Sequence, residues 1–192
     1  MGKNRLEAFS DGVIAIIITI MVLEMRAPHG ADLESLGPLL PVFLSYVLSF
    51  VHVAIYWNNH HHLLHTARHV TGGILWANLH LLFWLSLVPF VTAWMGENNF
   101  EQQPVALWGV VMLMAGVAYY ILTVVLIRHH GPESSLRAAV GSDSKGVISV
   151  LIYAVAIMVS FANRWVALAL YVAVALMWLV PDRRIERSAS TH

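Results

Sequence analysis

The sequence predicts an all-α membrane protein with six transmembrane helices. Hydrophobic residues make up 58% of the chain and charged residues 11%, whereas soluble domains carry roughly 25% charged residues. A helix needs about 20 apolar residues to cross a hydrocarbon layer of about 30 Å. Six such helices with short loops nearly use up the 192 residues. We therefore expect a single six-helix transmembrane domain over residues 1–192.

Six apolar runs along the chain define the expected helices, with ends that are uncertain by a few residues. Glycine and proline residues separate the first three runs, and the polar segment RHHGPESSLRAAVGSDSK separates the fourth from the fifth. Only Asn163 and Arg164 separate the last two, so these runs should form a tight hairpin in which both residues are simple loop residues. The runs cover 8–26, 39–60, 73–95, 104–127, 145–162 and 164–181.

The distribution of basic residues predicts the orientation of this bundle. Six crossings place both termini on one side, and nine of the 11 Lys and Arg residues fall on that side. Because basic residues are retained on the cytoplasmic side, we expect cytoplasmic termini in a multi-pass protein of the cell membrane. The nine are Lys3, Arg5, Arg68, Arg128, Arg137, Lys145, Arg183, Arg184 and Arg187, against Arg26 and Arg164 on the other side.

Several other classes receive no support from the sequence. The first apolar run is not closed by a small-residue cleavage site, which argues against a secretory signal peptide. There are no cysteines, and this excludes disulfides and thiolate metal sites. A net charge of zero gives no indication of nucleic-acid binding. Five tryptophans near the ends of runs are expected as interface anchors: Trp57, Trp94, Trp108, Trp165 and Trp178.

The first run contains a carboxylate, Asp11, just inside its amino-terminal end. A charge within the membrane costs about 3 kcal/mol unless it is paired or wet, so it indicates a functional or assembly site. At about 100° per residue, Ile16, Ile20 and Leu23 lie within about 60° of arc, and Phe9 and Gly12 extend this stripe. Asp11 falls about 140° away from Ile16. The stripe can be ordinary core or lipid surface, or it can line a pore in a symmetric oligomer.

The segment RLEAFSD carries a resemblance to a known family. It matches the RxxxFSD signature of the transmembrane protein 175 family of potassium channels through Arg5, Phe9, Ser10 and Asp11. The stretches FSDGVIAIIITIMVLEMRAP, YWNNHHHLLH and NLHLLFWLSLVPFVTAWMGE also resemble its prokaryotic members. The resemblance is strongest over residues 5–96.

The resemblance implies a homotetramer in the lipid bilayer whose central pore is lined by the first helix and passes potassium ions. Bulky apolar residues constrict that pore in the family, and the matching positions here are Ile16, Ile20 and Leu23. Thr19, beside them, is the expected polar contact for an ion. The family also joins its FSD segment to the second and third helices by a polar network, for which Trp57, His60, His61 and Asn78 are the candidates.

The sequence contains no TVGYG-like segment and no Arg-rich span of the voltage-sensor type. A potassium filter of backbone carbonyls is therefore missing, and selectivity would come from side chains of the first helix. We expect modest discrimination of potassium over sodium in a leak-type channel. Such a channel is not an enzyme and is expected to need no catalytic residue, cofactor or ATP.

Histidine is abundant, with 11 in the chain. His61 with His65, and His65 with His69, have the i, i+4 spacing that can chelate zinc on one helix face. This leaves a His-dependent membrane metal-ion transporter or enzyme as the alternative function, and a non-conducting scaffold as a third. His52 and His80 lie inside apolar runs, where we expect each to make an interhelical hydrogen bond.

Overall fold

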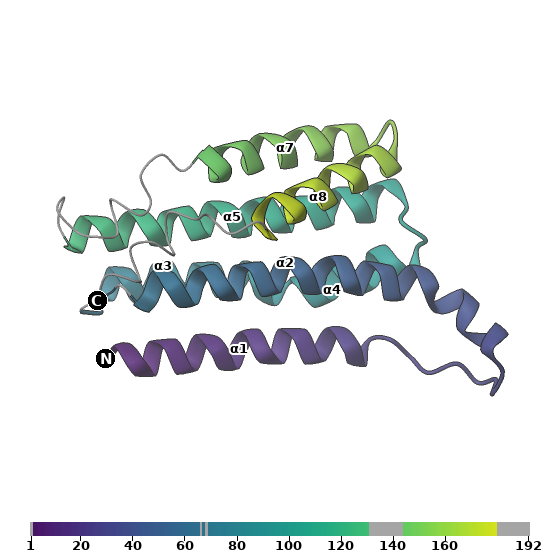
Figure 1. The fold of residues 1–192 in the computed structure, drawn as a ribbon, viewed down its shortest axis with the longest axis horizontal. Helices are drawn as coiled ribbons and strands as arrows, with labels where there is room; N and C mark the ends of the chain where they lie inside the picture. Colours follow the sequence, from purple (N-terminus) through teal and green to yellow (C-terminus); the bar gives the residue numbers. More distant parts are fainter. Residues whose placement is uncertain (1, 66, 68, 131–143, 180–192) are drawn as a thin grey trace.

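The structure is a computed structural model that describes residues 2–65, 67, 69–130 and 144–179, and these residues form helices without a strand (Figure 1). Four helices are long and apolar enough to cross a membrane, and two shorter apolar helices follow them. The protein is thus a multi-pass membrane protein. The helices are α1 (Lys3–Leu23), η1 (Leu33–Leu39), α2 (Leu40–His65), α3 (Gly72–Ser86), α4 (Val88–Glu97), α5 (Gln102–His130), α7 (Ser144–Ser160) and α8 (Arg164–Leu179).

These helices begin and end within a few residues of the expected runs, with one difference in the third. The run 73–95 is two helices, because α3 ends at Ser86 and α4 begins at Val88. Pro89 lies in the first turn of α4, where its missing N–H is tolerated, but it cannot continue the hydrogen-bonding of α3. Residues 180 and 181 of the sixth run lie outside the described residues, as do five basic residues used for the orientation: Arg68, Arg137, Arg183, Arg184 and Arg187.

The arrangement of the bundle puts α1 at one edge and α7 at the opposite edge (Figure 1). The first helix contacts α2, α3 and α4, whereas α5 contacts α3, α4, α7 and α8. Fully buried side chains of α5, among them Trp108, Met112, Leu122 and Leu126, form the centre of the core. The bundle therefore holds together around α5, and α1 is attached to its side.

The position of Trp108 near the end of a run predicted an interface anchor, but the structure places this residue in the core. Its ring is fully buried and packs against Tyr171 at a centroid distance of 4.9 Å. Its indole nitrogen donates to Ser49 Oγ at 2.8 Å. The prediction was wrong because hydropathy shows the depth of a residue along a span but does not show which face of the helix meets the core.

The connection between α7 and α8 corrects a second prediction. Asn163 accepts hydrogen bonds at its side-chain oxygen from the backbone N–H groups of Trp165 and Val166, and so caps the start of α8. Arg164 forms an ion pair with Glu101, next to the start of α5. Both residues thus tie the hairpin to the bundle and are more than loop residues.

The loop after α1 contains a local cap of a similar kind. Asp32 accepts hydrogen bonds from the hydroxyl of Ser35 at 2.6 Å and from its backbone N–H at 2.8 Å. These bonds lower the pKa of Asp32 below its usual value, and the bond from the Ser35 hydroxyl has the larger effect. The carboxylate is therefore charged at neutral pH and starts η1.

A close contact between α4 and α2 depends on a glycine, and this yields a prediction. A Cβ atom at Gly96 would lie 2.5 Å from Ser45 Oγ and 2.7 Å from Val42 Cα. Since a backbone atom cannot move aside cheaply, Gly96→Ala should lower the free energy of unfolding by about 1–3 kcal/mol. The control is Gly72→Ala, where a Cβ meets no atom within 4 Å. Thermal unfolding in detergent should show a lower midpoint for Gly96→Ala than for Gly72→Ala; equal midpoints would contradict the close contact.

Candidate functional site

The first helix has one face buried in the bundle. Its buried residues recur at helical spacing and point toward α2, α3 and α4. One of them, Ser10, is polar and fully buried. The buried residues are Leu6, Ser10, Ile14, Ile17 and Met21.

The opposite face of α1 is apolar and exposed. Ile16 is 58% exposed, Ile20 39% and Leu23 76%, and Phe9 lies on the same face. A large apolar side chain on one helix often faces lipid, but here four of them follow a single stripe. Thr19 is exposed beside them and donates its hydroxyl hydrogen to the Ile16 carbonyl at 2.9 Å. The structure thus puts all four residues expected at the constriction on the side of α1 that is exposed within the described part of the chain.

A buried chain of hydrogen bonds attaches α1 to its neighbours. His60 on α2 donates through Nε2 to Asn78 Oδ1 on α3 at 2.7 Å. The Asn78 amide donates to Ser10 Oγ at 2.9 Å, and Ser10 donates to the Leu6 carbonyl at 2.9 Å. All three side chains are at most 1% exposed. One continuous chain of donors and acceptors therefore joins α1, α2 and α3 in an environment without water.

Asp11 lies on the flank of α1, between the buried and the exposed face. The Trp57 indole N–H donates to its carboxylate at 3.0 Å. Trp57 is half exposed, and its ring stacks on His61 at a centroid distance of 6.3 Å. The hydrogen-bond partner of Asp11 is thus a tryptophan of α2. A second link lies one turn beyond His61, where Lys3 Nζ donates to the His65 carbonyl at 2.6 Å.

The remaining residues of the RxxxFSD segment and its expected network lie outside this buried chain. Arg5 and Phe9 are exposed on α1, and His61 is exposed on α2. His61 contacts Trp57, His62 and His65 through its ring. The structure therefore brings Ser10, His60 and Asn78 together, joins Asp11 to Trp57, and puts His61 on the surface.

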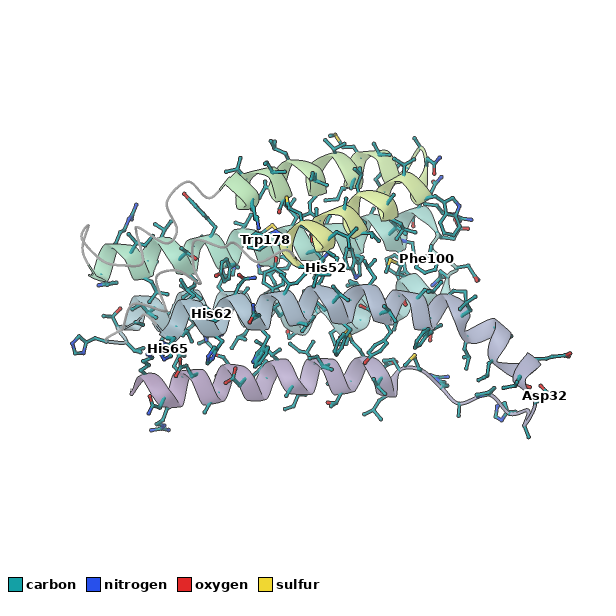
Figure 2. All side chains as sticks on the ribbon, viewed as in Figure 1. Asp32, His52, His62, His65, Phe100 and Trp178 are labelled. Carbon is teal, nitrogen blue, oxygen red and sulfur yellow. The ribbon has the colours of Figure 1, made fainter. Side chains whose placement is uncertain are left out.

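The histidines at the end of α2 do not form a metal site in the part of the chain that the structure describes. His62 and His65 lie at the end of the bundle where α1 begins, opposite Asp32 (Figure 2). Among the described residues, no group of three His, Asp or Glu side chains is close enough to hold a metal ion. A single-helix i, i+4 pair supplies two ligands, whereas zinc sites use three or four.

Among the described residues, the hydrogen bonds of His80 and His52 with the best geometry lie within their own helices. His80 Nε2 accepts from the Trp84 indole one turn along the same helix, at 3.0 Å. His52 Nδ1 donates to the Leu48 carbonyl, also one turn away, at 2.8 Å. Residues four positions apart lie on one face, so these partners were available within each helix.

Sequence reasoning missed two polar features of the bundle. Glu7 Oε1 is buried and, within the described residues, accepts no hydrogen bond. Ser49, Thr92 and Trp108 form a second buried cluster that joins α2, α4 and α5, with the two hydroxyls 2.6 Å apart. The available sequence signal for this cluster was the position of Ser49 relative to His52 and His60 along the predicted helix. Spacing within one helix does not show which residues of other helices are its partners.

This geometry defines what the site can do. Among the residues described around α1, it presents an apolar stripe on a helix whose other face is held by buried hydrogen bonds. Such a stripe excludes water where several copies face each other.

Comparison with known proteins gives matches along the whole chain. A family model described as the endosomal/lysosomal potassium channel TMEM175 matches residues 5–89. A Chryseobacterium sp. (strain P1-3) protein named a potassium channel is 55% identical over 188 residues, which cover 98% of each chain. A Mus musculus protein named endosomal/lysosomal proton channel TMEM175 is 32% identical over 116 residues, 54% of this chain and 23% of that one.

A solved structure has the same fold. The crystal structure of a lysosomal potassium-selective channel TMEM175 homolog from Chamaesiphon minutus superposes with a TM-score of 0.80 at 26% sequence identity. The match covers 93% of this chain and 96% of that chain.

The buried chain of hydrogen bonds generates a prediction. Asn78→Leu keeps the approximate size of the side chain but leaves the His60 Nε2 hydrogen without an acceptor, which should cost about 1–3 kcal/mol of unfolding free energy. The midpoint of thermal unfolding of the purified protein measures this loss. Ser86→Ala is the control, because Ser86 is exposed on the same helix and bonds only the Phe83 carbonyl among its described contacts. If the two variants unfold at the same temperature, the buried chain does not hold α1 in place.

Proposed function

Because this chain belongs to the TMEM175 family, we propose that it forms a potassium-permeable channel. The observation that carries the proposal is the exposed apolar stripe on α1, the helix that carries RLEAFSD. The relative named a potassium channel matches this chain along 98% of both lengths. Ions would flow passively down their electrochemical gradient, in a leak-type channel without ATP, cofactor or enzymatic step.

We propose that four copies assemble around a pore lined by α1. One chain has a single exposed stripe on its first helix, so a closed pore lined by this helix requires a symmetric ring of copies. The position of α1 at the edge of the bundle supports this assembly, because none of the described helices covers its exposed face.

The stripe would then act as the constriction. Rings of Ile16, Ile20 and Leu23 would narrow the pore and exclude water, while Thr19 offers a hydroxyl beside them. The chain has no TVGYG segment, so any preference for potassium over sodium would arise from how these side chains limit hydration. We expect that preference to be modest.

The polar contacts behind the stripe would brace the pore helix. Ser10 takes part in the buried chain and Asp11 bonds Trp57, which holds the amino-terminal half of α1 at two points. Arg5 is exposed near the start of the same helix, where it would face a neighbouring copy or the water beyond the membrane. We expect both termini on the cytoplasmic side of the cell membrane, so these contacts would lie at the cytoplasmic end of the pore.

A second permeant ion is suggested by the names of more distant relatives. Vertebrate members that match 54% of this chain are named proton channels. We favour potassium because the potassium-channel relative matches the full chain at 55% identity, and the assay of ion flux separates the two ions.

Purified protein in liposomes tests the channel proposal. Vesicles loaded with potassium and diluted into sodium should develop a negative interior potential, which a voltage-sensitive dye detects, and a pH dye inside the vesicles reports proton entry. We expect a potential that requires the protein, and a mass measurement in nanodiscs should give four chains. An absence of flux under every gradient would support a non-conducting scaffold and overturn the proposal.

The stripe gives the sharpest prediction, because pore and packing roles differ in the sign of the effect. Ile16→Asn or Ile20→Asn should increase current and reduce the preference for potassium, since an amide wets a constriction that conducts poorly when dry. The matched control is Ile17→Asn on the buried face, where Ile17 is 3% exposed. There an unpaired amide should cost about 1–3 kcal/mol of stability without a gain of current. Reduced current with unchanged ion preference in Ile16→Asn and Ile20→Asn would remove the stripe from the pore.

A further inference from the structure

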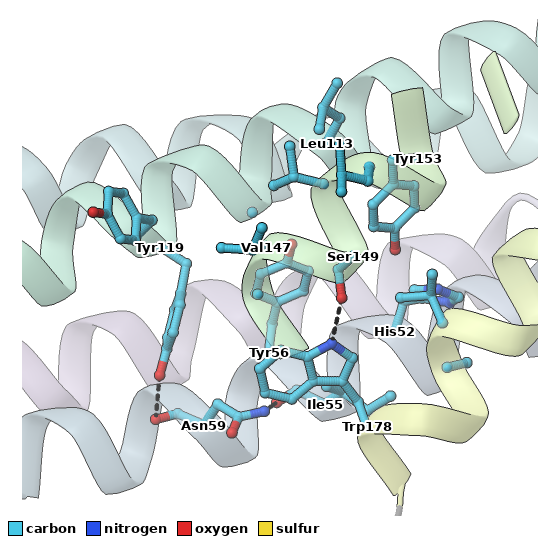
Figure 3. Close-up of a pocket in the computed structure, with 17 residues that line it drawn as sticks. His52, Ile55, Tyr56, Asn59, Leu113, Tyr119, Val147, Ser149, Tyr153 and Trp178 are labelled. Carbon is cyan, nitrogen blue, oxygen red and sulfur yellow. Dashed lines mark hydrogen bonds between the residues drawn. The ribbon is translucent and has the colours of Figure 1, made fainter. Parts of the chain in front are cut away.

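A cavity of about 290 Å³ lies between α2, α5, α7 and α8, away from the exposed face of α1 (Figure 3). Its wall is mainly aliphatic and aromatic, and none of its described lining residues is Lys, Arg, Asp or Glu. The residues of α2 that hold α1, Trp57 and His60, are also outside this lining. The cavity is therefore separate from the proposed pore.

The polar groups that α2 and α5 contribute to the wall are mostly bonded within the protein. Tyr56 on α2 donates to the Met112 carbonyl at 3.2 Å, and Tyr119 on α5 donates to the Asn59 carbonyl at 3.2 Å. The Asn59 amide donates to the Ile55 carbonyl, one turn earlier on α2, at 2.8 Å. These bonds use both phenolic hydrogens and one amide hydrogen.

A polar pair on α7 and α8 is bonded in the same way. Trp178 on α8 donates to Ser149 Oγ at 2.9 Å, and Ser149 on α7 donates to the Lys145 carbonyl at 2.7 Å. The indole and the serine hydroxyl therefore also use their hydrogens within the wall.

Tyr153 on α7 differs from these residues. It is 5% exposed, and its hydroxyl points into the cavity between Ser149 and His52 (Figure 3). This hydroxyl makes no hydrogen bond within the described residues, and its oxygen is not enclosed by protein atoms as His52 Nε2 is. The ring is held by Tyr171, at a centroid distance of 5.7 Å, and by His52, at 6.4 Å. A fixed, buried hydroxyl is thus available to a molecule in the cavity.

The mouth of the cavity is on the outer surface of the bundle. Tyr120, Val147 and Leu151 line it and are 58%, 62% and 60% exposed. The helix α7 is at the edge of the bundle opposite α1 (Figure 1), so this mouth faces the bilayer in an assembly whose pore is lined by α1. A molecule dissolved in the bilayer can enter between these side chains.

We propose that this cavity binds a small apolar carbonyl compound with an aromatic body, of the aryl ketone or quinone class, whose carbonyl oxygen accepts a hydrogen bond from Tyr153. The volume is close to the range of ligand cavities, about 300 to 1,000 Å³. The aliphatic and aromatic wall buries the body of the ligand. A buried hydroxyl without an acceptor is unfavourable, and the carbonyl oxygen supplies that acceptor.

The hydroxyl favours an acceptor that has no polar hydrogen of its own. A phenol has one hydrogen to donate, and a carbonyl oxygen accepts it in a single bond that leaves no polar hydrogen unpaired. An alcohol in the same place would add a second hydroxyl hydrogen, which would need another acceptor in a mainly apolar wall. A carboxylate would bring a charge that no Lys or Arg among the described lining residues compensates.

Two probes of nearly equal shape test the proposal. They are para-trifluoromethylacetophenone and para-trifluoromethyl-α-methylstyrene, which differ only in C=O against C=CH₂. Fluorine NMR of the full chain in nanodiscs measures both affinities, and empty nanodiscs give the partition into lipid, so that each affinity refers to the lipid-dissolved probe. The ketone should bind about two to ten times more tightly, the range expected for one net hydrogen bond.

Two tyrosine substitutions identify the donor. Tyr153→Phe keeps the ring against Tyr171 but removes the hydroxyl, so the two affinities should become equal. The matched control is Tyr120→Phe, which removes a hydroxyl at the exposed mouth and should leave the preference for the ketone unchanged. Equal affinities for the parent chain, a preference that survives Tyr153→Phe, or a preference lost in Tyr120→Phe would each overturn the proposal.

A second matched pair locates the binding. Val150 lines the cavity and Val155 lies on the same helix outside it, and the two are 39% and 46% exposed. Val150→Trp should abolish binding of both probes because its ring fills the space, whereas Val155→Trp should leave binding unchanged. Binding that survives Val150→Trp would place the probes elsewhere and overturn the proposal.

Discussion

The position of α1 depends on the hydrogen bonds from His60 through Asn78 to Ser10. These three side chains come from three helices and are shielded from water. In lipid, apolar surfaces gain little from meeting each other, so helices associate through close packing and polar contacts. Lipid offers no alternative hydrogen-bond partner, so a buried hydrogen bond between two helices fixes their rotation about their own axes as well as their contact. Here it turns the small hydroxyl of Ser10 inward and, by the geometry of a helix, turns Ile16 and Ile20 outward.

The rest of the bundle supports this arrangement at a second position along α2. The second buried cluster, of Ser49, Thr92 and Trp108, joins α2 to α4 and α5. Together the two clusters hold α2 at two positions along its length. These contacts fix α2, the helix that carries partners of α1. The orientation of α1 therefore depends on the core around α5.

The sequence predicted the helices well and their contacts only in part. Long apolar runs fix where a span lies, because the bilayer sets their length, and the break at Pro89 was the main miss within the third run. Helical spacing also predicted that Ile16, Ile20 and Leu23 share one face, but not that this face is exposed. It did not reveal that Trp57 bonds Asp11, that His52 and His80 bond within their own helices, or that Asn163 and Arg164 cap and tether the last hairpin. Those contacts depend on which faces of distant helices meet, and hydropathy along a single chain carries no such information.

The attachment of α1 at the edge of the bundle has a consequence for variation among related chains. Phe9, Ile16, Ile20 and Leu23 are exposed within the subunit, so exchanging one apolar residue for another there alters little of the folding energy of a single chain. Substitutions of Ser10, Asn78 and His60 cost more folding energy, because each leaves a buried donor or acceptor without a hydrogen-bond partner. Evolution can therefore change the exposed face of the first helix in small steps while the fold that presents it stays the same.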